Sequence, residues 1–263
     1  MRSHMMQARL MLVVTLALLA TLATIGQEAE YGFGGGGPGV GQLMSDLGAI
    51  NEFVEGAGFA RFSGNPLLVG GGGRGGLVPG PAFGGAGWGA WIESREGERH
   101  AEYGVGLGGF DMGYAIGGSN RSVLTVGGLF GAGGAEIIFT EYPPSEPSGI
   151  DPGGLVIEPE RTTYDSFFAF VAPYIDMQIQ LLDWVGLGVR ACYVQPIFEL
   201  AGSSSGPLDP PNLAPSGPYV RFSIVFGGFG ALEPTPSAEP DLRPTPEPEP
   251  KAEPSIQTES IVP

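Results

Sequence analysis

Apolar and polar residues alternate with a period of two along much of the chain between residues 66 and 230. In the segment 174–181 the odd positions are apolar, and the even positions are tyrosine, aspartate and glutamine. In the segment 220–226 the even positions are apolar, whereas Arg221 and Ser223 occupy alternate places. This period is typical of β-strands that bury one face. We therefore predict strands near Leu67–Gly72, Ala82–Glu93, Arg99–Met112, Ser122–Gly133, Thr163–Leu181, Trp184–Glu199 and Pro218–Phe229.

The connections between these strands predict how they are arranged. The segments 95–98 and 117–120 are typical of hairpin turns, and residues 182–183 would form a turn of nearly the minimum length. The connections 141–161 and 200–217 are long, and both would lie at the same end of an up-and-down sheet. The chain is therefore predicted to be all-β, with an antiparallel up-and-down sheet or barrel of about 7–8 strands. Long loops at one end and tight turns at the other occur in outer-membrane barrels and in soluble ones.

One predicted strand has a face with almost no side chains. Gly104, Gly106 and Gly108 alternate with larger apolar residues. Glycine weakens a strand, so its repetition indicates that another backbone or a bulky side chain approaches this face closely. We accordingly expect Gly106→Val to overpack the core and to destabilise the protein by about 1–3 kcal/mol.

A short amphipathic helix is predicted before the strands, near Gln42–Glu55. Its apolar residues recur at helical spacing, which makes one stripe that must be buried against the sheet. Gly56 and Gly58 follow as a C-terminal stop. The preceding glycine-rich run, 34–39, is expected to be neither a stable helix nor a central strand. The stripe consists of Leu43, Leu47, Ile50 and Val54.

The two ends of the chain differ from the middle. Residues 1–27 combine a short segment carrying arginine, an apolar run and small residues, which is the order of a secretory signal peptide. Residues 28–65 hold the glycine-rich segment and the helix, and 66–230 form the β-domain. Residues 231–263 repeat Glu-Pro and Thr-Pro units, so we expect an extended, disordered tail. The chain is thus predicted to be exported.

Composition excludes several classes of function. The formal net charge of -16 repels nucleic acid, so DNA and RNA binding are excluded. Lys251 is the single lysine, so the chain lacks a polybasic patch for anionic lipid. Cys192 is the single cysteine, so the fold must be held by packing and strand pairing without an internal disulfide.

Candidate catalytic chemistry is weak. In the mature chain His100 is the one histidine, and it lies beside a charged turn. A Ser-His-Asp set cannot be built without it, and Cys192, among apolar strand residues, is expected to be a buried structural thiol. His and Cys do not show the spacing of metal ligands. Paired carboxylates such as Glu93 with Glu96, and Glu158 with Glu160, are expected to be solvated.

The glycine run 70–75 matches the dinucleotide-binding pattern G-x-G-x-x-G, but only formally. Pro79 and Pro81 follow in place of a helix, and the surrounding segments do not form a βαβ unit. We therefore predict no catalytic, cofactor-binding or metal-binding residues, no cofactor and no enzymatic activity.

Several features together resemble a known kind of protein. These are the N-terminal leader, the glycine-rich opening, a short helix ending in Gly58-Phe59, the run 70–76, and the strand Tyr103–Phe110. They resemble glycine-rich bacterial envelope proteins of uncharacterised function, which are similar to small outer-membrane β-barrels. The resemblance covers roughly residues 31–229. It implies an even number of strands, whereas seven are predicted above. Either an eighth strand is hidden near 134–140, or the sheet is not a closed membrane barrel.

Two functions are consistent with these observations. The first is a non-enzymatic structural or interaction protein of the cell envelope, built as an outer-membrane-type barrel, with membrane lipid, other envelope proteins or a second copy as partners. The alternative is a secreted soluble barrel or sandwich that binds a small apolar ligand or self-associates. A membrane barrel places its apolar residues outside, and a soluble barrel places them inside. Trp88, Trp91 and Trp184 suit either arrangement.

Overall fold

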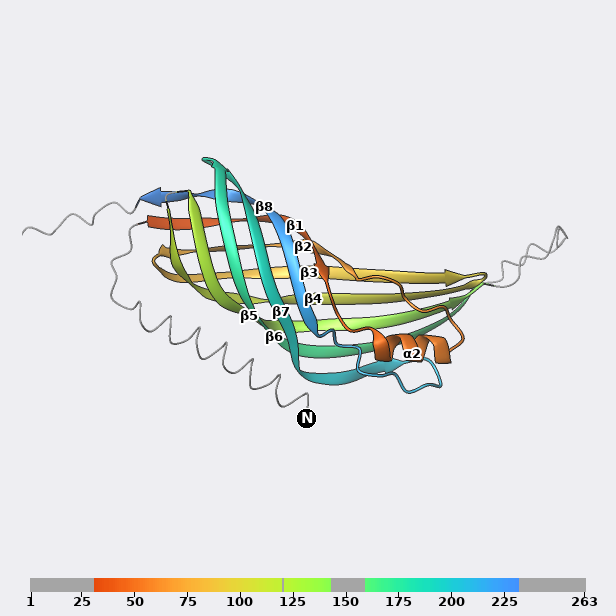
Figure 1. The fold of residues 1–263 in the computed structure, drawn as a ribbon. Helices are drawn as coiled ribbons and strands as arrows, with labels where there is room; N and C mark the ends of the chain where they lie inside the picture. The colour runs from red at the N-terminus through yellow and green to blue at the C-terminus, as the bar shows by residue number, and fades with distance from the viewer. Residues whose placement is uncertain (1–30, 120, 143–158, 232–263) are drawn as a thin grey trace, which may run out of the picture. The chain divides into compact units, whose positions relative to one another are not determined.

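Eight antiparallel strands, each paired with the next, close into a barrel through pairing of the first strand with the last (Figure 1). The computed structural model describes residues 31–119, 121–142 and 159–231. The predicted signal peptide therefore lies outside the described residues, as does the predicted tail except for Ala231, which ends β8. The predicted all-β, up-and-down fold with one short helix is confirmed. The elements are β1 (Tyr31–Leu43), α2 (Gly48–Gly56), β2 (Leu67–Val78), β3 (Gly80–Glu96), β4 (Arg99–Ser119), β5 (Ser122–Glu141), β6 (Glu160–Leu182), β7 (Val185–Ser204) and β8 (Gly217–Ala231).

The eighth strand is the glycine-rich run near the start of the chain. The expectation that residues 34–39 form no central strand was wrong, because they lie within β1 and pair with β2 on one side and with β8 on the other. A Cβ atom at Gly39 would lie 2.6 Å from the Phe222 carbonyl oxygen and 3.1 Å from the Trp88 ring. Glycine therefore lets β1 pass close to its neighbours across a narrow lumen.

All seven strands predicted from the sequence are present, and most are longer than predicted. The suggestion of a hidden strand near 134–140 was wrong, because these residues continue β5 to Glu141 and pair with β4 and β6. The run 70–75 lies inside β2 and is paired on both sides, so it is not followed by a helix. The dinucleotide-binding pattern is thus part of a strand.

The apolar stripe of the predicted helix is buried as expected, although the helix is shorter. Helix α2 begins only at Gly48. The predicted first residues of the helix belong to β1 instead, which ends at Leu43, where the backbone N–H donates to the carbonyl of Pro66. Leu43, Leu47, Ile50 and Val54 all join one apolar cluster with side chains of the strands. Phe53 on α2 packs at 5.8 Å from Phe139 and 5.2 Å from Tyr164, measured between ring centroids.

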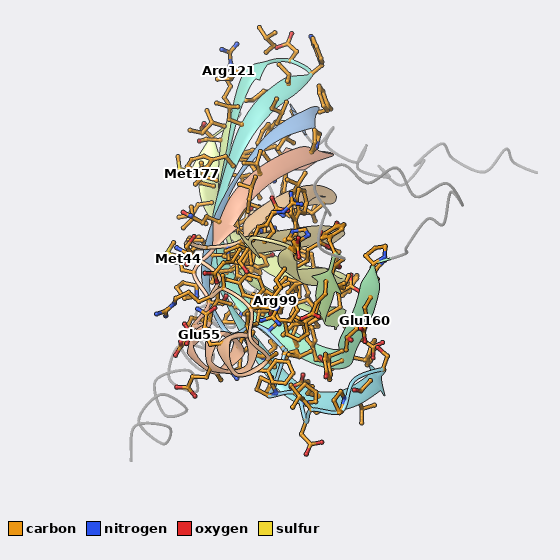
Figure 2. The ribbon with its side chains drawn as sticks, turned by 90° about the vertical axis from the view of Figure 1, so that its right-hand side faces the viewer. Met44, Glu55, Arg99, Arg121, Glu160 and Met177 are labelled. Atoms are coloured by element: carbon orange, nitrogen blue, oxygen red, sulfur yellow. The ribbon has the colours of Figure 1, made fainter. Side chains whose placement is uncertain are left out.

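The barrel has two different ends. The strands from β3 to β7 extend past β1, β2 and β8 at the end where α2 lies (Figure 1). Figure 2 shows Glu55, Arg99 and Glu160 at this end and Arg121 at the opposite end. The connections β1–β2, β3–β4, β5–β6 and β7–β8 fall at the α2 end. The start of β1, the end of β8 and the turns β2–β3, β4–β5 and β6–β7 fall at the other end. The strands that flank the two predicted long connections begin and end at the α2 end of the barrel, and residues 143–158 lie outside the described residues.

The bare face of β4 points outward, which contradicts the expectation of a closely approaching neighbour. Tyr103, Val105 and Leu107 point into the barrel and are buried, so the glycines between them lie on the outer surface. A Cβ atom at Gly106 would meet nothing within 4 Å. Other glycines are tight, and Gly133, which faces the lumen from β5, is one of them. A Cβ at Gly133 would approach the Gly106 carbonyl oxygen and would lie 2.7 Å from the Phe168 ring.

These two positions give a matched test of packing. We expect Gly106→Val to leave stability unchanged or to raise it, because valine favours strands and has open space there. Gly133→Val should lower the free energy of unfolding by about 1–3 kcal/mol through overpacking. Urea unfolding of both variants under the same conditions measures the difference. Equal losses at both positions would contradict the outward placement of Gly106.

Candidate membrane surface and charged lumen

The outer surface of the barrel is covered with large apolar side chains. On β6 the residues Ile175, Met177, Ile179 and Leu181 all point outward and are exposed, as are Phe222, Ile224 and Phe226 on β8. Figure 2 shows Met177 on this outer surface. Along β6 the outward positions from Phe167 to Leu181 carry no charge. Other exposed apolar residues on the strands include Val40, Leu67, Val69, Leu77, Phe83, Phe110, Met112, Ile116, Leu124, Phe130, Phe167, Leu182, Leu187, Val189, Ile197, Phe198 and Leu200.

Two of the three tryptophans mark the ends of this apolar band. Trp91 on β3 is 59% exposed toward the α2 end, and Trp184 in the β6–β7 turn is 62% exposed at the other end. Trp184 stacks on Phe226, with the ring centroids 6.2 Å apart. Trp88 instead points into the lumen and is 4% exposed. Exposed aromatic residues at both ends of an apolar band are a property of membrane-spanning barrels.

Outward-facing charges begin where the apolar band stops. Glu93 on β3 lies directly opposite Glu102 on β4, and Glu136 on β5 lies directly opposite Asp165 on β6. All four are on the α2 side of the band. Like charges directly opposite one another are unfavourable unless water or counterions screen them, so this part of the strands is suited to an aqueous environment.

The lumen, in contrast to the outer surface, contains charged side chains. Five charged residues from five different strands meet inside the barrel, and all are buried. Asp176 contacts three guanidinium groups: Arg74 binds Oδ1, Arg190 Nε lies 2.8 Å from Oδ2, and Arg221 Nη2 lies 3.8 Å from Oδ2. Arg190 Nη1 also lies 2.6 Å from Asp111 Oδ2. We call these residues the luminal cluster: Arg74, Asp111, Asp176, Arg190 and Arg221.

Aromatic rings hold the luminal cluster in place. The Tyr174 hydroxyl donates a hydrogen bond to Asp111, and the Arg190 guanidinium lies 3.8 Å from the centre of the Tyr174 ring. The Arg221 guanidinium lies 4.5 Å from the Trp88 ring. Cation–π contacts of desolvated arginine are worth about 2 kcal/mol or more. The cluster thus fills the cross-section of the barrel with side chains held by ion pairs and by stacking.

An apolar core lies at the α2 end. Phe59 stacks on Phe139 with the ring centroids 4.5 Å apart, and buried Tyr103 donates a hydrogen bond of 2.8 Å to the carbonyl of Leu213 in the β7–β8 connection. Asn51 on α2 accepts a 2.8 Å hydrogen bond from the Phe62 N–H. Burial, together with the nearby Glu199 carboxylate, raises the pKa of Tyr103 above its ordinary range. Helix α2 and two connections therefore close this end of the barrel as a packed unit.

The candidate residues that the sequence analysis considered for catalysis or metal binding are not members of the luminal cluster. Cys192 is buried in β7, as expected. His100 lies beside the β3–β4 turn, where its Nε2 is 3.3 Å from Glu93 and its Nδ1 is 3.7 Å from Glu102. From the sequence, His100, Glu93 and Glu102 were not predicted to lie together, although all three are close to the same predicted hairpin turn. Glu160 is exposed, and Glu158 lies outside the described residues.

Sequence reasoning also missed the luminal cluster. Its one local signal is a charged residue in an inward place between outward apolar ones, as Asp176 stands between Ile175 and Met177. The partners lie 102 residues apart in the case of Arg74 and Asp176, so only the closed register brings them together.

No family model matches the chain, and no curated protein matches it. A solved structure of Ail, the attachment invasion locus protein of Yersinia pestis, in complex with the heparin analogue sucrose octasulfate, is similar with a TM-score of 0.39 and 12% identity, over 77% of this chain and 100% of that chain. A likeness at this level is too weak to indicate a function. Within the described residues, no helix has the length and apolarity needed to cross a membrane.

Proposed function

We propose that this protein is a non-enzymatic outer-membrane β-barrel of the bacterial envelope, exported by the predicted signal peptide. One observation carries the proposal: the distribution of side chains is inverted relative to a water-soluble barrel. Ile175 and Met177 point outward and are exposed, whereas Asp176 between them is buried among three arginines. Apolar residues outside and polar residues inside is the arrangement that a lipid environment favours.

Physical reasoning supports this choice over a soluble barrel. In water, an apolar band around the whole barrel would be an unfavourable exposed surface, far larger than soluble monomers carry. In a bilayer the same band is solvated by lipid, and pairing of β1 with β8 removes the two free edges that an open sheet would expose. The charged residues are then placed away from lipid, where they pair with one another.

The luminal cluster argues against a wide pore. The cavity between Arg74, Asp111, Arg190 and Arg221 measures about 20 Å³, which is space for roughly one water molecule. A drug-sized ligand needs a pocket of about 300 Å³ or more. The lumen therefore serves as a polar core, and we propose that the protein acts through its surface as a structural or interaction protein.

The α2 end is the part of the barrel that we propose to contact other envelope components. It carries the acidic outward residues, the packed helix and the longer connections, and it extends past the apolar band. Its rigidity comes from buried aromatic contacts such as that of Phe59 with Phe139. Binding residues are common on loops that a rigid scaffold positions.

Extraction from membranes distinguishes this function from the secreted soluble alternative. We expect the full chain to stay with the outer-membrane fraction through high-salt and alkaline washes and to be released only by detergent. We also expect the folded barrel to migrate faster in cold SDS gels than after boiling, because closed barrels resist SDS. A periplasmic protein of the same cells serves as the control. Recovery of the folded chain in the soluble fraction without detergent would contradict the proposal and favour the soluble alternative.

A further inference from the structure

The luminal cluster is not electrically balanced. It contains three arginines and two aspartates, and arginine stays protonated in proteins. Among the residues that the structure describes, the other titratable side chains facing this part of the lumen are Tyr174, Cys192 and Tyr219, and none of them carries a negative charge in ordinary neutral conditions. One positive charge is therefore left over in a buried position, which is strongly unfavourable without a counter-charge.

The excess charge is concentrated on two of the arginines. Arg190 is held between both aspartates, at 2.6 Å and 2.8 Å. Arg74 reaches Asp176 through Nη2 alone, and Arg221 comes no closer than 3.8 Å to that carboxylate. The Nε and Nη1 donors of Arg74 and Arg221 are buried and find no acceptor among the residues that the structure describes. Both side chains are more than nine-tenths buried.

These arginines border a cavity of the matching size. Arg74, Arg190 and Arg221 line it together with Asp111, whose carboxylate is paired with Arg190, and with the side-chain-free backbone of Gly36 and Gly73. Its volume is about 20 Å³, enough for roughly one water molecule or one monoatomic ion. Phosphate, sulfate and carboxylate metabolites are too large for this space.

We propose that the lumen of the barrel binds one chloride-sized inorganic anion between Arg74 and Arg221. The anion neutralises the leftover charge and accepts hydrogen bonds from guanidinium donors that otherwise have no partner. A water molecule fits the same space but supplies no charge. The site is independent of what the α2 end contacts, and it also does not require that the proposed membrane location be correct.

Halide-dependent stability tests the site on the purified full-length protein in a neutral detergent. At constant ionic strength, replacing gluconate with chloride up to about 0.5 M should raise Tm by about 2–4 °C, the shift for a site with a Kd of roughly 0.1 M. Arg221→Met should remove this dependence, because two arginines then balance two aspartates. Arg121→Met, at an exposed arginine, should keep it. A Tm that does not respond to chloride in the unaltered protein would overturn the proposal.

Bromide gives a second measurement that needs no variant. Crystals of the unaltered protein soaked in bromide should show an anomalous-scattering peak between Arg74 and Arg221. Density for water alone at that position, with bromide bound elsewhere, would overturn the proposal even if Arg221→Met failed to fold.

Discussion

Replacing Asp176 with asparagine is expected to lower the free energy of unfolding by about 3–5 kcal/mol. Asp176 is the carboxylate that Arg74, Arg190 and Arg221 all contact. Asparagine keeps the size of the side chain but removes the charge, so three buried guanidinium groups would share Asp111 alone. Removing one partner of a buried ion pair leaves an uncompensated charge away from water, which is why the loss is large. Urea unfolding of the barrel in detergent measures it.

Two further variants separate charge from packing at Asp176. Asp183→Asn changes an exposed aspartate in the β6–β7 turn and should leave the unfolding midpoint nearly unchanged. The double variant Asp176→Asn with Arg221→Met should recover part of the loss, because residues in one ion-pair network are coupled. If Asp176→Asn cost less than about 1 kcal/mol, the luminal cluster would be hydrated rather than paired, and our account of the lumen would be wrong.

Ile175→Arg is expected to destabilise the barrel in a lipid bilayer by about 2–4 kcal/mol. Ile175 lies outward near the middle of the apolar stretch of β6, where an arginine would meet hydrocarbon and could not reach water easily. In a soluble barrel the same outward position would face water, and the substitution would be nearly neutral. The prediction is measured by urea unfolding after refolding into phosphatidylcholine vesicles.

Leu181→Arg is the matched control for this experiment. Ile175 is 57% exposed and Leu181 is 54% exposed, and both point outward from β6. Leu181 lies beside the β6–β7 turn, so an arginine there is expected at the edge of the bilayer and should cost about 0–1 kcal/mol. Equal costs at the two positions would contradict a bilayer around this band.

Much of the architecture was present in the local pattern of residues. The alternation at 174–181 and 220–226 fixed which residues share a face, because the side-chain period of a strand is two. The short turns and long connections fixed the up-and-down order. The apolar stripe Leu43–Val54 correctly indicated buried residues. Helical spacing explains this for Ile50 and Val54 on α2, whereas Leu43 is buried as the last residue of β1.

The glycine-rich strand could not be recognised from local sequence. Residues 34–39 have poor strand propensity, and their place in β1 depends on neighbours that lie far away in the chain: β2 and the last strand, β8. Once the barrel closes, the narrow lumen leaves little room for side chains on this strand. Closure of the barrel likewise determines which face of β4 lies outside, and this is the face that carries Gly104, Gly106 and Gly108.

The sequence by itself therefore determined the strands, their order and the two-faced character of each. Only the tertiary structure decided which face is inside. Alternation is the same for a membrane barrel and for a soluble one, because it records that two faces differ and not which of them meets the lumen. Closure brings Asp176 together with Arg74, 102 residues away, and turns Ile175 outward in the same step. A charge can be buried there because its partners come from other strands, and no local window of sequence contains them.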